Sequence, residues 1–273
     1  MKNIMGAVVC FAVLLCAPQD AYAGGDVREV VQKIASSLLA KHSGAKAALL
    51  ESSADRAFNE YFTVNAPEKK RAAKAAVEKL MLEFSKKHDS GEMCLIGAGG
   101  PELARVNDGH IAHDLDPNEV DNEFFGPAMA QKPKTVYITR PYISHDMKKW
   151  VIAYATPIAF SGQTKAILHF EYSLEVYQML LRQADNPEMR AMLVSAEGNI
   201  LGDSRAIIPV SQLGEDNKPE SYFKKFSLSG LTLDAVKNKL RGGAGRLGQG
   251  DNALSVAWRA LPSDMTLVVV QDP

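Results

Sequence analysis

A change in hydrophobic period near residue 90 constrains this fold more than any other feature of the sequence. From Asp26, apolar residues recur at the three- and four-residue spacing of an amphipathic helix. The residues on this apolar face are Val27, Val30, Val31, Ile34 and Leu38. After Gly91 the apolar runs become short and are separated by glycine, proline, aspartate and asparagine, which is typical of strands and turns. Helices followed by an antiparallel sheet predict an α+β fold.

The β-like region divides into two units. Runs at 150–160 and 165–172 are separated by a short turn, so they are predicted to pair as an antiparallel hairpin. A helical pattern at 174–184 follows, and the strand pattern then restarts at Ala191. The glycine-rich stretch 242–250 is expected to be a mobile loop. We therefore predict four parts: a signal peptide at 1–23, a helical region at 24–90, a first module at 91–187 and a second, smaller module at 188–273.

The first residues have the features of a cleavable secretory signal peptide. A positive charge at Lys2 precedes an apolar run, and the small-residue ending Ala21-Tyr22-Ala23 predicts cleavage after Ala23. The apolar run is about 14 residues long, whereas a membrane-spanning helix needs about 20. The predicted location is therefore periplasmic or secreted. An uncleaved membrane anchor is the alternative.

Cysteine content and charge exclude several classes of protein. After residue 23 the sequence contains only Cys94, so no intramolecular disulfide is expected. The net charge is −1, and no basic surface for a nucleic acid is predicted. No Cys-x-x-Cys-His motif for haem is present, and no cofactor is expected. His110 and His113 have a spacing that could bind a metal on a helix, but they follow a turn, so they are interpreted as solvated loop residues and no metal is predicted.

A series of short motifs between Glu102 and Tyr172 resembles the double Cache sensor domains, which are PAS-like and lie outside the membrane in bacterial chemoreceptors, histidine kinases and diguanylate cyclases. The matching motifs, in order, are Glu102–Val106, Asp116-Pro117 with Glu119, Phe124–Ala128, Arg140–Ser144, Lys149–Ile152, Ala155–Ile158 and Leu168–Tyr172. The resemblance implies a long N-terminal helix, a membrane-distal module that usually holds a ligand, and a membrane-proximal module. It also implies a non-catalytic sensor that binds a small organic molecule and signals to a partner.

Two departures from this family affect the prediction. Family members usually continue into a membrane helix and a signalling module, whereas this sequence ends at Pro273. A separate membrane-bound receptor, histidine kinase or cyclase is therefore the expected partner. The amino-acid-binding branch carries an Arg-x-Trp-Tyr motif where this chain has Asn122-Glu123-Phe124-Phe125. An amino-acid ligand thus has no support from that motif.

Side-chain alternation along the predicted strands suggests where a ligand would bind. In a single strand at 135–143, Arg140 and Tyr142 would share one face, and Arg140 could anchor a carboxylate through its planar guanidinium. The predicted ligand-binding residues are Arg140, Tyr142, Trp150, Tyr154, Thr156, Phe125, Phe170 and Asp146. The alternative is that the aromatic residues pack in the core and that Arg140 pairs with a local acid such as Asp146.

Two other functions have some support in the sequence. Ser144, His145 and Asp146 have the residue types of a hydrolase triad, but consecutive residues rarely reach triad geometry, so catalysis is not predicted. The apolar face at 27–38 could instead form a homodimer or dock on a membrane-bound partner. Packing of this face against the chain's own modules is the preferred interpretation.

Overall fold

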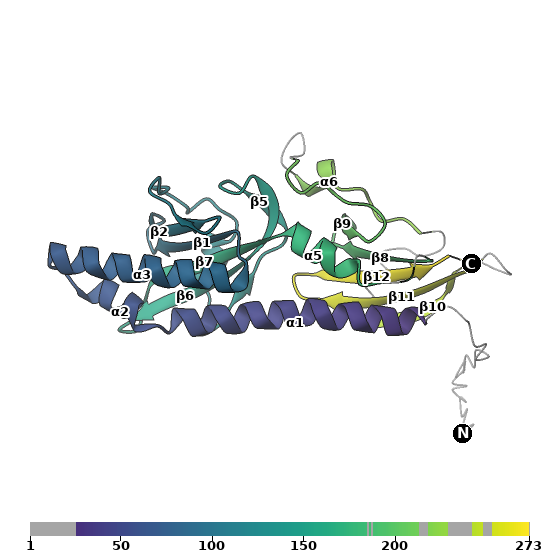
Figure 1. The fold of residues 1–273 in the computed structure, drawn as a ribbon, viewed down its shortest axis with the longest axis horizontal. Helices are drawn as coiled ribbons and strands as arrows, with labels where there is room; N and C mark the ends of the chain where they lie inside the picture. Colours follow the sequence, from purple (N-terminus) through teal and green to yellow (C-terminus); the bar gives the residue numbers. More distant parts are fainter. Residues whose placement is uncertain are drawn as a thin grey trace, which may run out of the picture.

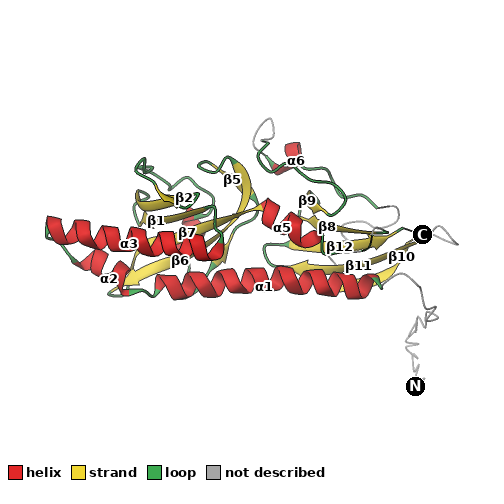
Figure 2. Ribbon diagram, viewed as in Figure 1, coloured by secondary structure: helices red, strands yellow, loops and turns green. Residues whose placement is uncertain are grey.

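The computed structural model describes residues 26–184, 186, 188–212, 218–228, 242–247 and 253–272. The predicted signal peptide and its cleavage site lie outside the described residues. Helices and antiparallel sheets are both present, which confirms the α+β prediction (Figures 1 and 2). The helices are α1 (Val27–Ser53), α2 (Arg56–Thr63), α3 (Pro67–His88), α4 (Phe125–Met129), α5 (Leu174–Leu181) and α6 (Pro219–Tyr222).

Helix α1 runs along both sheets and connects them (Figure 1). Its N-cap is Asp26, whose side chain accepts a hydrogen bond from the backbone N–H of Arg28 at 2.9 Å. Its length of 27 residues corresponds to about 40 Å. Its buried face includes Val31, Ile34 and Leu38, which pack within the chain rather than face solvent. None of the described helices is long and apolar enough to cross a membrane.

The first sheet has strand order β3-β2-β1-β7-β6-β4, and β5 also pairs with β6. Its strands are β1 (Glu92–Gly97), β2 (Glu102–Asn107), β3 (His110–Ile111), β4 (Tyr137–Ile138), β5 (Tyr142–Ser144), β6 (Lys149–Phe160) and β7 (Gln163–Ser173). Helices α1 and α3 pack on one face, and the short helix α4 packs on β6 and β7. We call this sheet with α2, α3 and α4 the first module.

The second sheet has strand order β10-β11-β12-β8-β9. Its strands are β8 (Met189–Val194), β9 (Ile200–Asp203), β10 (Gly242–Leu247), β11 (Leu254–Leu261) and β12 (Met265–Gln271). Helices α1 and α5 contact this sheet. We call the sheet, together with the described residues between β9 and β10, the second module. The expected loop at 242–250 is wrong for residues 242–247, which form β10.

The predicted single strand at 135–143 is also wrong. It is divided into β4 and β5, which both pair with β6 but are separated by Thr139, Arg140 and Pro141. Proline has no backbone N–H to donate to a neighbouring strand, and Thr139 uses its side-chain oxygen to accept the N–H of Ala153 at 2.9 Å. Arg140 therefore does not continue the face of a regular strand.

Candidate functional site

The two faces of the first sheet differ in chemistry because residues alternate along each strand. One face, packed against the helices, carries Trp150, Tyr154 and Phe170, each fully buried. Tyr154 and Phe170 stack with ring centroids 5.0 Å apart and planes 7° apart. The Tyr154 hydroxyl also contacts His42 on α1 and Tyr177 on α5. These predicted ligand-binding residues are therefore part of the packing between the sheet and the helices.

Thr156, another predicted residue on β6, and Trp150 make further structural contacts. The Thr156 hydroxyl donates to the backbone oxygen of Thr135 at 2.8 Å, which holds the segment leading into β4. The Trp150 ring packs against Tyr222 and Phe223, with centroid distances of 5.5 and 4.9 Å. Tyr222 and Phe223 lie between β9 and β10 in sequence, and the adjacent Lys224 accepts a backbone hydrogen bond from Ile200 of β9 at 2.8 Å, so Trp150 contacts the second module.

Arg140 lies at the boundary between the modules. Its guanidinium pairs with Glu197 at 3.0 Å and with Asp264 at 3.2 Å, both in turns of the second module. The side chain is 60% exposed, so these ion pairs are solvated. The expected partner Asp146 is elsewhere, and Arg140 and Tyr142 do not share a strand face.

The opposite face of the first sheet, which we call the far face, carries a group of mostly buried polar side chains. We define this polar cluster as Glu92, Cys94, Glu102, Arg105, Tyr142, Asp146, His169 and Glu171. Pairing of the strands brings its central members together. Glu92 lies directly opposite Glu171, and Cys94 lies opposite His169 on β7 and Arg105 on β2.

A β-bulge brings Glu102 into the cluster. Leu95 pairs with Ala104 but Ile96 pairs with Glu102, so Leu103 is an extra residue in β2. Glu102 thereby joins the same face as Cys94, whose thiol donates to Glu92 Oε1 at 2.9 Å and lies 3.3 Å from Glu102 Oε1. Simple alternation along β2 would have placed Glu102 with Ala104 on the helix-packed face.

Arg105 supplies the guanidinium group of the polar cluster, and acidic side chains surround it. It contacts Glu102 at 3.1 Å, Asp146 at 2.9 Å and Asp114 at 2.8 Å. The Arg105 side chain is only 4% exposed, and its charge-assisted bonds run from the buried Glu102 to the exposed Asp114, whose side chain is 88% exposed. Asp146, a predicted ligand-binding residue, therefore belongs to the cluster through Arg105.

Tyr142 covers the β7 side of the cluster. Its hydroxyl donates to the Glu171 carboxylate and lies 3.2 Å from Nε2 of His169. The Phe124 ring stacks on the His169 ring with centroids 4.2 Å apart. Phe125, another predicted residue, is buried on this face in the same apolar group as Phe124. Tyr142 and Phe125 are thus the predicted residues that the structure places over the far face.

Burial and crowding of acids shift the protonation of this cluster. Burial, and then the Glu171 carboxylate, raise the pKa of Glu92. Burial, and then the Glu92 carboxylate, also raise the pKa of the Cys94 thiol. Both groups therefore favour their neutral forms more than exposed residues would. A bound positive charge would oppose these shifts.

Most members of the polar cluster were not predicted from the sequence. Glu92, Cys94, Glu102, Arg105, His169 and Glu171 are absent from the predicted set, which follows the aromatic residues at alternate positions of the strands. The available signal was the segment Leu168–Tyr172, where His169 and Glu171 alternate with apolar residues in the middle of a long apolar strand. Polar residues in a strand that is buried on both faces indicate a polar interior site.

Ser144, His145 and Asp146 do not form a triad arrangement. The Ser144 hydroxyl lies 3.4 Å from Glu92 and accepts the backbone N–H of Met147 at 3.1 Å. Asp146 pairs with Arg105, and His145 is exposed. The three consecutive residues are therefore used in separate contacts, and they lack the linked geometry of a nucleophile, base and orienting acid.

The second module contains a cavity of about 340 Å³. Its lining includes Ile200, Ile208, Tyr222 and Phe223, together with Asp203, which pairs with Arg190 at 2.5 Å. The lining is mainly apolar, in contrast to the polar cluster of the first module.

Comparison with solved structures identifies the fold. The sensory domain of the Campylobacter jejuni chemoreceptor Tlp3 aligns with a TM-score of 0.68 at 13% identity, covering 90% of this chain and 92% of that domain. The extracellular domain of the histidine kinase vpHK1S-Z8 aligns with a TM-score of 0.59 at 13% identity, covering 90% and 93%. A domain of a sensory box/GGDEF family protein from Vibrio parahaemolyticus aligns with a TM-score of 0.60 at 13% identity, covering 89% and 97%. The sequence matches no protein-family model and no curated protein. These alignments confirm the double Cache type of fold.

Proposed function

We propose that this protein is an exported, non-catalytic sensor that binds a small ligand at the polar cluster of the first module and signals to a membrane-bound partner. A chemoreceptor, histidine kinase or cyclase would be such a partner. The observation that carries the proposal is a group of buried, interacting polar side chains on the far face of a sheet in a sensory-domain fold. Burial of charged groups is costly, and a bound ligand would offset part of that cost.

The charge of the polar cluster favours a positively charged group on the ligand. Glu92, Glu102, Glu171 and Asp146 supply carboxylates, whereas Arg105 supplies the cation and already contacts acids. A carboxylate ligand anchored by Arg140, as predicted from the sequence, would bind at the solvated module boundary instead. Two structures of the Tlp3 sensory domain hold isoleucine and L-valine, which carry an ammonium group. We propose that a cationic or amine-bearing ligand occupies this cluster.

A signal from the first module has a direct physical route to the second. Helix α1 packs on both sheets, and the start of β6 contacts the second module through the backbone N–H of Trp150, which donates to Val210 at 2.9 Å. A ligand that moves the β6–β7 hairpin would therefore shift contacts in the second module. We propose that a partner reads this shift.

A thermal-shift screen of amines, amino acids, organic acids and metal salts tests the proposed function. We expect cationic or amine-bearing compounds to raise the melting temperature, since they bind only the folded protein. Glu171→Gln should abolish the shift, whereas Glu175→Gln, at an exposed site on α5, should retain it. Stabilisation by organic acids alone, or an equal shift in Glu171→Gln, would contradict the proposal.

A further inference from the structure

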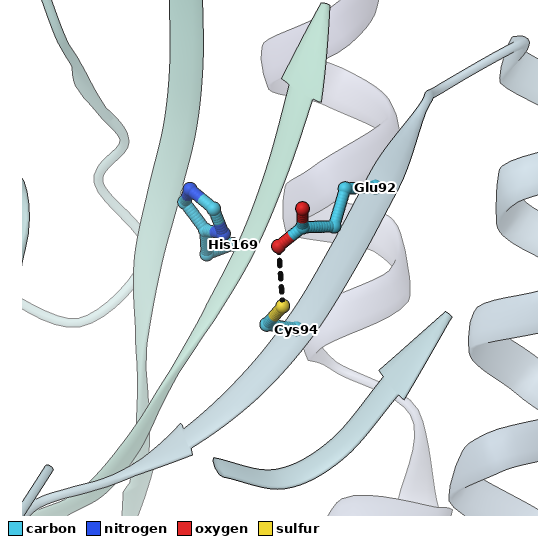
Figure 3. Close-up of side chains that lie close together, drawn as sticks. All are labelled: Glu92, Cys94 and His169. Atoms are coloured by element: carbon cyan, nitrogen blue, oxygen red, sulfur yellow. Dashed lines mark hydrogen bonds between the residues drawn. The ribbon is translucent and has the colours of Figure 1, made fainter. Parts of the chain in front are cut away.

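Glu92, Cys94 and His169 bring three kinds of metal ligand to one place on the far face (Figure 3). Their ligand atoms, a carboxylate oxygen, a thiol sulfur and an imidazole nitrogen, all lie within 4.8 Å of one another. Glu92 and Cys94 are two residues apart on β1, and His169 is the cross-strand partner of Cys94 on β7. Since β1 lies between β2 and β7 inside the sheet, the backbone holding these ligands is rigid.

The chemistry of this set matches a borderline-soft divalent cation. Thiolate, imidazole and carboxylate are the ligands of Zn²⁺ sites, at about 2.3 Å for sulfur and about 2.0–2.2 Å for nitrogen and oxygen. Three protein ligands leave the fourth position of a tetrahedral Zn²⁺ site for water or an external ligand.

An independent observation indicates that the cluster lacks a partner. Within the described part of the chain, Nδ1 of His169 and Oε2 of Glu171 are buried and have no hydrogen-bond partner. Their side chains are only 2% and 3% exposed. An unsatisfied buried polar atom is costly, and Glu92 and Glu171, which lie directly opposite across strands, repel each other when both are ionised. A dication bound through Nδ1 of His169 would satisfy that nitrogen and offset the negative charge of the neighbouring carboxylates.

We propose that Glu92, Cys94 and His169 bind a thiophilic divalent metal ion of the Zn²⁺ class. This rests on the proposed function, because it names the cationic ligand of the same site. Asp146, which pairs with Arg105 at the edge of the polar cluster, has a side chain that is 29% exposed. On binding, any proton held by the thiol or a carboxyl is released to the buffer as the metal–ligand bonds form.

Cobalt titration of the full chain, after chelator treatment, tests the metal site. Co²⁺ adopts the Zn²⁺ geometry, and we expect one equivalent to give a thiolate-to-cobalt charge-transfer band that Zn²⁺ then removes. Cys94→Ser should abolish the band, and His169→Gln should weaken Zn²⁺ binding by at least about 100-fold, the upper end of the loss seen for outer-shell partners. The double variant His110→Gln/His113→Gln, at exposed positions, should bind as the unmodified chain does.

The outcomes separate the metal site from the proposed function. Absence of the band, or its retention in Cys94→Ser, overturns the metal site. If Cys94→Ser does not fold, Cys10→Ser/Cys16→Ser leaves Cys94 as the only cysteine, and loss of the band there overturns the site. If an amine stabilises the chain, this stabilisation depends on Glu171 and no metal binds, then the metal site is contradicted and the proposed function stands. If neither amines nor metal salts stabilise the chain, both proposals fail.

Discussion

The two faces of the first sheet are built from the same strands and yet have opposite roles. On β7, Leu168, Phe170 and Tyr172 face the helices, while His169 and Glu171 face the short helix and loops on the other side. The helix-packed face is dominated by apolar contacts, and the far face by charge-assisted hydrogen bonds. A period of two along a single strand thus separates what holds the fold together from what can bind a ligand.

Truncation of a helix-packed residue should have the largest effect on stability. Phe170→Ala removes a fully buried ring that stacks on Tyr154 and contacts Phe84 of α3. We expect a loss of about 3–5 kcal/mol in the free energy of unfolding, measured by urea denaturation. The neighbouring far-face change Ile167→Val should cost only about 0.5–1.5 kcal/mol, because it removes one methylene group. A loss for Phe170→Ala well below its expected range would contradict the role of this face as the packed core.

Acid should destabilise the helix-packed face through His42. Burial, and then Lys46, lower the pKa of His42 from 6.5 to about 4. The unfolded chain then binds a proton that the folded chain excludes, so this contribution to stability is present above pH 6.5 and is lost as the pH falls towards 4. The expected loss is about 3 kcal/mol over that window.

The non-titrating variant His42→Gln isolates this effect. Tyr154 and Tyr177 contact the imidazole, and neither tyrosine titrates in this range because burial raises both pKa values. Urea denaturation at several pH values should show a shallower decline for His42→Gln than for the unmodified chain. Parallel declines would show that folding does not lower the pKa of His42.

The architecture could be predicted from the sequence because its signals are local. The apolar spacing at 27–38 directly predicts helix α1, and the short turn between the runs at 150–160 and 165–172 directly predicts the pairing of β6 with β7. β10 was missed because its glycines mimic a loop. A Cβ at Gly243 would lie 2.4 Å from the Trp258 ring, so glycine is needed where this strand crosses the tryptophan.

The site could not be predicted because its placement depends on irregular strand geometry. The bulge in β2 reverses the face of Glu102, and the break at Pro141 takes Arg140 out of register. Trp150, Tyr154 and Phe170 were predicted to bind a ligand because they are aromatic, but they lie on the helix-packed face and pack in the core. Only Tyr142, Phe125 and Asp146 of the predicted residues lie at the polar cluster.

Loss of Arg140 should have the smallest effect. Its ion pairs to Glu197 and Asp264 are exposed, and such pairs contribute about 0–1 kcal/mol because water and salt screen them. We expect Arg140→Ala to unfold at nearly the same urea concentration as the unmodified chain and to keep any thermal shift given by a ligand of the polar cluster. A ligand shift lost in Arg140→Ala but retained in Glu171→Gln would move the binding site to the module boundary. It would also restore the carboxylate anchor predicted from the sequence, since a guanidinium freed from its two acids can grip a carboxylate with two parallel hydrogen bonds.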